Sequence, residues 1–121
     1  MIFSHFLSTA FDISFSSRTY YGKVATLEDP IGKVVLETKL VYDESLMTNF
    51  TTRDYSLYQS DGTRYFNVDK NGIVTLKRFL PNQRLYDFQI SLLYTVSLVD
   101  KMTTSGFLTA DVRVQAVGMT K

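Results

Sequence analysis

Hydrophobic side chains alternate with polar ones in short runs along most of the chain. Phe11, Ile13 and Phe15 show this period of two near the start, and Ala110 and Val112 show it near the end. Such alternation is typical of β-strands that bury one face. It predicts seven strands: residues 11–24 as one edge strand in two halves (11–15 and 20–24), then 33–42, 55–57, 65–68, 73–76, 85–99 and 107–117.

Turn residues separate these runs. Pro30 and Gly32 mark a turn at residues 28–32, because proline fixes φ and glycine permits unusual backbone angles. The pair Asp61 and Gly62 predicts a tight turn into the strand that follows it. Further polar connections are expected at residues 43–52 (with room for a helical turn near Leu46), 69–72, 81–82 and 100–106.

Seven strands with one buried face each predict two sheets packed face to face. Val34, Leu36 and Leu40 are the expected inward residues of the second strand. An up-and-down barrel is the alternative, because strand count alone does not separate the two architectures. The domain is expected to span residues 11–117, between a flexible N-terminal segment at 1–10 and a C-terminal tail at 118–121.

Length and charge narrow the function. A chain of 121 residues is long enough to form one core of its own. Its formal net charge is +1 and its cations are scattered, so nucleic acid is not an expected partner. Cysteine is absent, which excludes disulfides, thiolate zinc sites and thiol nucleophiles. The only histidine, His5, lies in the segment expected to be a chain end, and no constellation predicts an enzyme.

Two features bear on the compartment. Asn49, Phe50 and Thr51 fit the N-glycosylation pattern, which makes Asn49 a candidate glycan site and favours secretion. The apolar start of the chain lacks a basic region, so we interpret it as a chain end rather than a complete signal peptide. No run approaches the ~18 apolar residues of a membrane helix.

Four segments occur in an order that is similar to a cadherin repeat. They are residues 28–36 (with Glu28, Pro30 and Gly32), the Asp-Tyr-Ser-Leu of 54–57, the Tyr-Phe-Asn-Val-Asp-Lys-Asn-Gly-Ile-Val-Thr-Leu of 65–76, and the alternating runs of 86–90 and 110–114. The likeness spans roughly residues 11–117. It implies a seven-stranded Greek-key β-sandwich of the cadherin and immunoglobulin type. It also implies an extracellular repeat of a single-pass membrane protein in cell–cell adhesion, with neighbouring repeats and a homophilic or heterophilic protein as partners.

The departures from the cadherin pattern concern calcium. Glu28 matches the family's early glutamate, but residues 81–84 read Pro-Asn-Gln-Arg where the family has an Asp-Arg-Glu type motif. The family's later Asp falls on Tyr94, or on Asp100 if an insertion is allowed, and residues 115–121 contain no acid. Calcium takes six to eight oxygen ligands. We therefore expect weak or absent binding, with at most a partial calcium site at Glu28 completed by a neighbouring repeat at a domain junction.

Two further readings follow from the aromatic residues. Strand-swapping cadherins exchange an N-terminal Trp between partners. That mode of adhesion is not available here, because the chain has no Trp. The alternative function is a carbohydrate- or ligand-binding β-sandwich attached to an enzyme or a secreted protein, which requires an exposed aromatic patch or a pocket. Aromatic residues that alternate along strands are more often core, and adjacent Tyr20 and Tyr21 must point to opposite faces.

Overall fold

The structure is a computed structural model that describes residues 11–118, and most of this part of the chain is β-strand. The expectations placed on residues 1–10, including His5, and on residues 119–121 lie outside the described residues. The strands are β1 (Ile13–Phe15), β2 (Thr19–Ala25), β3 (Val34–Glu37), β4 (Leu40–Tyr42), β5 (Met47–Tyr58), β6 (Phe66–Val68), β7 (Ile73–Leu76), β8 (Leu85–Leu98) and β9 (Thr103–Val117). A 3₁₀ turn, η1 (Glu44–Leu46), precedes β5, and a short helix, α2 (Ser60–Tyr65), follows it.

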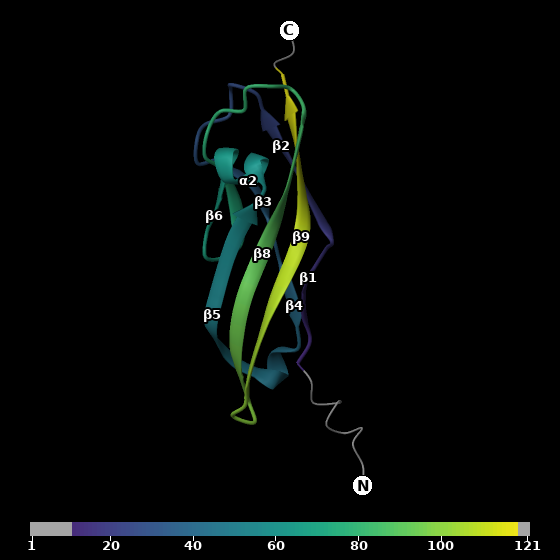
Figure 1. The fold of residues 1–121 in the computed structure, drawn as a ribbon, viewed down its shortest axis with the longest axis vertical. Helices are drawn as coiled ribbons and strands as arrows, with labels where there is room; N and C mark the ends of the chain where they lie inside the picture. The colour runs from purple at the N-terminus through teal and green to yellow at the C-terminus, as the bar shows by residue number, and fades with distance from the viewer. Residues whose placement is uncertain (1–10, 119–121) are drawn as a thin grey trace.

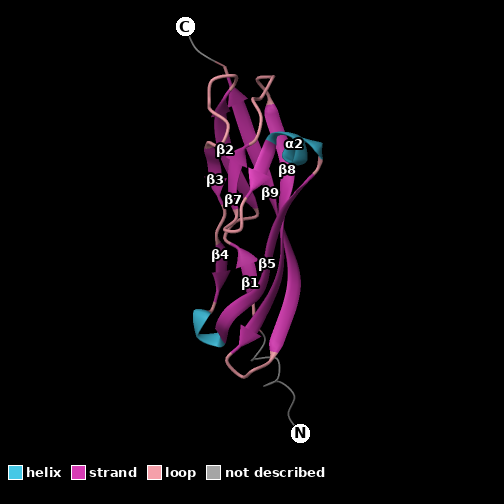
Figure 2. Cartoon of the chain, turned by 90° about the vertical axis from the view of Figure 1, so that its left-hand side faces the viewer, coloured by secondary structure: helices cyan, strands magenta, loops and turns pink. Residues whose placement is uncertain are grey.

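The strands form three sheets in two layers (Figures 1 and 2). One layer is the four-stranded sheet β2-β9-β8-β5, in which β2 runs parallel to β9 and the other pairs are antiparallel. The second layer consists of β3-β7-β6 towards the C-terminal end and the pair β1-β4 towards the N-terminal end. The sheets are open, so the sandwich is confirmed and the alternative of a closed barrel is wrong.

The strand count agrees with the predicted seven when β1 with β2, and β3 with β4, are each counted as one interrupted strand. β1 and β2 are the two halves of the first strand, and they join different sheets. The chain crosses between layers from β5 to β6 and from β7 to β8, so that strands far apart in sequence become neighbours, as in a Greek key.

The core lies between the layers and comes from every second residue of the long strands. Phe66 and Phe88 stack across it with ring centroids 4.8 Å apart. Around them lie fully or almost fully buried side chains of β7, β8 and β9: Val74, Leu76, Tyr86, Ile90, Leu92, Val96, Ala110, Val112, Val114 and Ala116. The hairpin of β6 and β7, predicted from residues 65–76, thus contributes to the main core.

The second predicted strand is wrong in one respect, because residues 33–42 do not form a continuous strand. Thr38 and Lys39 interrupt it, so β3 pairs with β7 and β4 pairs with β1. A register shift between Val34 and Leu36 also turns Val34 outward, where it is 50% exposed, while Leu36 stays buried. A bulge of this kind breaks strict alternation, which the sequence pattern assumes.

Two predicted connections are also strand in part. β5 begins at Met47 rather than after residue 52, and β9 begins at Thr103 rather than at residue 107. Serines and threonines dominate both stretches, yet their backbones pair with β8, as in Ser97 with Thr103. A stretch of strand with mostly polar residues cannot be distinguished from a loop by its sequence pattern. The helical turn expected near Leu46 is present as η1.

The predicted tight turn at Asp61 and Gly62 is a helix instead. Both residues lie in α2, and Gly62 is buried against the ring of Phe88. A Cβ atom at Gly62 would lie 2.8 Å from that ring, so only glycine permits the helix to approach β8 so closely.

Candidate functional site

The C-terminal end of the sandwich holds the residues for which the sequence predicts a junction role. The β2–β3 loop, the β7–β8 loop and the end of β9 meet here, at the top of Figure 1. The backbone N–H of Thr26 donates a hydrogen bond to the carbonyl of Val117, and the backbone N–H of Ala116 donates one to the carbonyl of Arg84. These backbone hydrogen bonds join the three segments.

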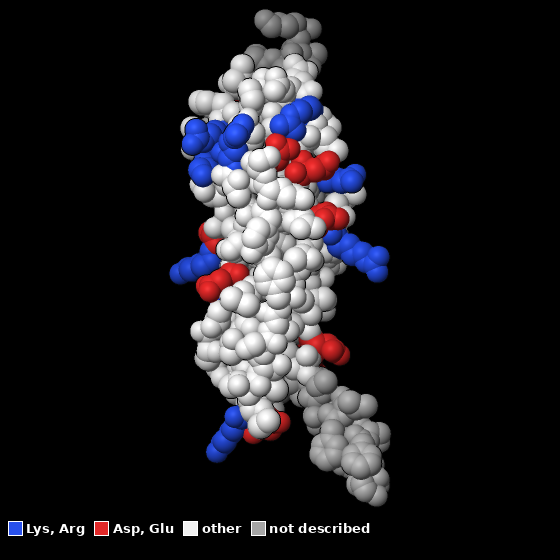
Figure 3. Space-filling view, viewed as in Figure 1, with Lys and Arg blue, Asp and Glu red and all other residues white. Residues whose placement is uncertain are grey.

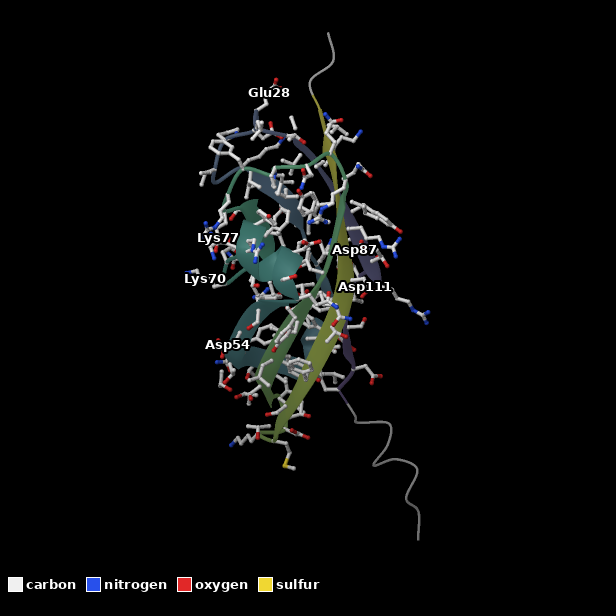
Figure 4. All side chains as sticks on the ribbon, turned by 45° about the horizontal axis from the view of Figure 1, so that its top comes forward. Glu28, Asp54, Lys70, Lys77, Asp87 and Asp111 are labelled. Atoms are coloured by element: carbon white, nitrogen blue, oxygen red, sulfur yellow. The ribbon has the colours of Figure 1, made fainter. Side chains whose placement is uncertain are left out.

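Glu28 and Asp29 lie in the β2–β3 loop but have different surroundings. The carboxylate of Asp29 accepts hydrogen bonds from the backbone N–H of Ala25 and from Nζ of Lys33, both at 2.7 Å. The hydrogen bond from Lys33 is the main reason that the pKa of Asp29 is lowered. Glu28 is exposed and points away from the domain (Figure 4). Asp29 therefore closes its own loop, and Glu28 is the carboxylate directed outward.

The β7–β8 loop carries an arginine where the cadherin pattern has acidic residues. Arg84 holds Asp61 of α2 through two nitrogens, Nη1 to Oδ2 and Nη2 to Oδ1, each at 2.9 Å. Its guanidinium also lies 3.7 Å from the centre of the Tyr86 ring. The paired hydrogen bonds between the two side chains lower the pKa of Asp61 and raise the pKa of Arg84. The ion pair joins α2 to the start of β8 across 23 positions of sequence.

Tyr86 fixes the same loop from inside the core. Its side chain is fully buried, and its hydroxyl accepts a hydrogen bond from the backbone N–H of Asn82 and donates one to the carbonyl of Asn82, each at 3.2 Å. A tyrosine that bonds back to the chain a few residues before it, at the start of this strand of a sandwich, is a tyrosine corner. This role was not predicted from the sequence, although the position of Tyr86 after the Pro81-Asn82 loop was a usable signal.

These residues do not fit a complete calcium cage on their own. Calcium needs six to eight oxygens, most of them anionic or carbonyl. Within residues 11–118 no group of three or more Asp, Glu, His or Cys side chains is arranged to hold a metal ion. Asp29 and Asp61 are held by cations, which leaves Glu28 as the outward carboxylate at this end.

Asp43 and Asp100 lie at the opposite end of the sandwich, in η1's cap and in the β8–β9 turn. Asp43 caps η1, where it accepts hydrogen bonds from the hydroxyl and the backbone N–H of Ser45, and these lower its pKa. Asp100 accepts a hydrogen bond from the backbone N–H of Met102 in the β8–β9 turn. Tyr94, the alternative position, is a buried ring that packs over Gly106. Each of these side chains has a local structural partner.

Asn49 lies on β5, an edge strand of the four-stranded sheet, and it is exposed. Thr51, two residues later, is exposed as well. The sequon is therefore on a strand rather than in the predicted loop.

The aromatic residues divide as the alternation predicts. Tyr94 is 8% exposed and Tyr21 is 71% exposed, while Tyr20 and Tyr65 are half-buried. On the outer face of the four-stranded sheet, Phe107 lies beside Leu93. This apolar pair is flanked by serines and threonines and does not extend into an aromatic platform.

Comparisons with known proteins agree with this architecture. No family model matches the chain, and no curated protein matches it. Among solved structures, mouse cadherin-23 EC22-24 is similar with a TM-score of 0.64 and 20% identity, over 92% of this chain and 32% of that one. Human protocadherin-24 EC1-2 is similar with a TM-score of 0.64 and 16% identity, over 90% of this chain and 53% of that one. Drosophila N-cadherin EC1-4 is similar with a TM-score of 0.60 and 21% identity, over 90% of this chain and 24% of that one.

The chain thus has the fold of a cadherin extracellular repeat. It spans between about a quarter and about half of these larger structures. At this level of identity the similarity shows the fold, and the activity and partners of this chain are matters for proposal. No helix within the described part of the chain is long and apolar enough to cross a membrane.

Proposed function

We propose that this chain is an extracellular cadherin-like repeat that serves as a structural and interaction module in cell–cell adhesion, with weak or absent calcium binding. The observation that carries the proposal is the cadherin-repeat fold itself, with the two ends of the described chain at opposite ends of the sandwich (Figure 1). Neighbouring cadherin-like repeats, in the extracellular part of a single-pass membrane protein, are its proposed partners along the chain.

The geometry suits a repeat that transmits force and spacing. β8 and β9 have 14 and 15 residues and remain paired from Leu85 with Gln115 to Ser97 with Thr103. At about 3.3 Å per residue, a strand of this length extends for about 45 Å. A load applied at the two ends therefore acts along the direction of these strands.

The composition of the C-terminal end supports a calcium-poor junction. In place of a cluster of carboxylates, the end is fastened by Asp29 with Lys33 and by Asp61 with Arg84. Glu28 remains as a single outward ligand, which a neighbouring repeat would have to complete. An adhesion module of this kind keeps its own end ordered without the metal.

A bead-aggregation assay tests the adhesion role. Beads coated densely with the chain are expected to cluster through homophilic contacts, to the same extent in millimolar calcium and in chelator, because no complete metal site orders the surface. Beads coated with an unrelated β-sandwich are the control. If the coated beads stay dispersed in both buffers, homophilic adhesion by this repeat is wrong.

Asn49 is the proposed glycan site. On secretion from cultured animal cells, a mass that falls after treatment with a glycan-removing amidase is expected, and Asn49→Gln should abolish that change. An unmodified mass in the secreted chain would contradict the assignment.

A further inference from the structure

Folding gathers cations that are scattered in the sequence. Arg64 lies in α2, and Lys77 and Arg78 begin the β7–β8 loop. The backbone N–H groups of Lys77 and Arg78 both donate to the carbonyl of Tyr65, and Nζ of Lys77 donates to the carbonyl of Thr63 at 3.1 Å. The loop is thereby pinned against the helix that carries Arg64. We call Arg64, Lys77 and Arg78 the α2 basic patch.

The patch is visible as blue side chains gathered over α2 in Figure 3, and Figure 4 places Lys70 on the same side of the molecule as Lys77. Residues 60–65 and 77–84 together carry four cations and one carboxylate, a net charge of +3, whereas the whole chain has a net charge of +1. The rest of the chain is therefore slightly acidic, and the positive charge is concentrated here.

Arg64, Lys77 and Arg78 form no ion pair within the described residues, and the contact that Lys77 makes with Thr63 is a hydrogen bond to a neutral carbonyl. The ion pairs found between residues 11 and 118 involve Lys33, Arg84 and Arg113 instead. The one carboxylate of α2, Asp61, is held by Arg84. Arg64 and Arg78 are exposed and Lys77 is half-buried. Clustered like charges repel one another, and an anionic partner would relieve that repulsion.

We propose that the α2 basic patch binds a sulfated polysaccharide chain. Sulfate groups carry permanent negative charge, and the guanidinium groups of Arg64 and Arg78 can donate paired hydrogen bonds to their oxygens. Phe79, 49% exposed and next to Arg78, offers an apolar ring beside the cations against which a sugar ring can pack. Clusters of Lys and Arg are a recognised signal for heparin-like ligands.

Other partners fit the surface less well. A protein partner is usually anchored by an apolar side chain in a pocket, and the hollows described on this domain are lined by other residues, such as Ile13, Val41 and Tyr42. Readout of duplex DNA places a helix or a two-stranded ribbon in the major groove, and α2 has only six residues. This inference goes beyond the adhesion role and does not depend on it.

The test measures binding of the whole chain to immobilised heparin at about 0.15 M salt. Substitution of Arg64, Lys77 and Arg78 by Gln is expected to weaken binding about tenfold or more and to flatten its salt dependence. The matched control replaces Arg18, Lys23 and Lys39, which are exposed outside α2 and the β7–β8 loop, by Gln. Both variants lose three positive charges, but the control is expected to change binding less than about twofold.

The proposal would be overturned by no binding of the unmodified chain, by equal losses in the two triple variants, or by equal affinity for a single-stranded oligonucleotide of matched charge. The unsulfated polysaccharide hyaluronan is expected not to bind. Because Lys77 also donates to Thr63, the exposed single variants Arg64→Gln and Arg78→Gln serve as a second test if the triple variant unfolds. Each of them is expected to weaken heparin binding, and unchanged binding in both would contradict the assignment.

Discussion

Arg84 holds both carboxylate oxygens of Asp61 at 2.9 Å, and it does so from the loop where the cadherin pattern places acidic residues. The pair joins α2 to β8 at the C-terminal end of the sandwich. A paired, hydrogen-bonded arginine and carboxylate hold a fixed geometry better than a single contact does. We interpret this pair as the fastening of an end that does not depend on metal.

Asp61→Asn should lower the free energy of unfolding by about 1 kcal/mol at neutral pH, since it removes a two-point ion pair that is partly exposed. Arg84 lowers the pKa of Asp61 in the folded state, so the stabilisation is present above the ordinary carboxyl pKa of 3.8 and is lost as the pH falls through the lower, folded value. Chemical denaturation should show a constant difference in the free energy of unfolding between the two proteins from about pH 7 to about pH 5. This difference should become smaller below about pH 4. A difference that widens in acid would contradict the assignment.

Tyr86→Phe should destabilise the domain by about 1–2 kcal/mol, because the N–H and the carbonyl of Asn82 lose their shared partner while the buried ring is kept. Tyr65→Phe is the matched control. The Tyr65 ring packs edge-on against Tyr86 at 5.3 Å, and its hydroxyl makes no hydrogen bond within the described residues. Thermal unfolding of both variants checks this expectation. Equal losses of stability would show that the corner hydrogen bonds contribute nothing special.

Gly106→Ala should destabilise the domain although alanine suits a strand better than glycine does. A Cβ atom at this position would lie 2.6 Å from Cζ of the Tyr94 ring, which lies directly opposite on β8. The buried ring must move, at a cost of about 1–3 kcal/mol. In a Tyr94→Leu background the same substitution should be much less costly, as a double-mutant cycle would reveal. If the cost is unchanged there, the Tyr94 ring is not its source.

The sequence predicted the β6–β7 hairpin well because each level of evidence agreed. Residues 66–76 alternate with a period of two, and the turn between them has Asp69 to accept backbone hydrogen bonds and Gly72 at a φ of 78°. The same reasoning failed at Val34, where a bulge changes the face without changing the composition. The local sequence pattern therefore predicts an element whose shape is set by neighbouring residues, and it misses a bulge that is set by pairing with another strand.

The candidate site was less predictable because its contacts join distant residues. Glu28 was proposed from its motif, but the ion pair of Asp61 and Arg84 depends on where α2 comes to lie, and its residues 61–62 were predicted as a turn. The same is true of the α2 basic patch, whose cations are at most a pair in sequence. Neither feature has a periodic signal, so only the fold could reveal them.

Thermal unfolding during a calcium titration shows whether the C-terminal end of the sandwich depends on metal. We expect the same unfolding midpoint for this chain in millimolar calcium and in chelator, because the pair of Asp61 and Arg84 fastens that end. A complete site saturated at one hundred times its dissociation constant would add about 2.7 kcal/mol and raise the midpoint by several degrees. A saturable rise of that size, abolished by Glu28→Gln, would show that this end binds calcium after all.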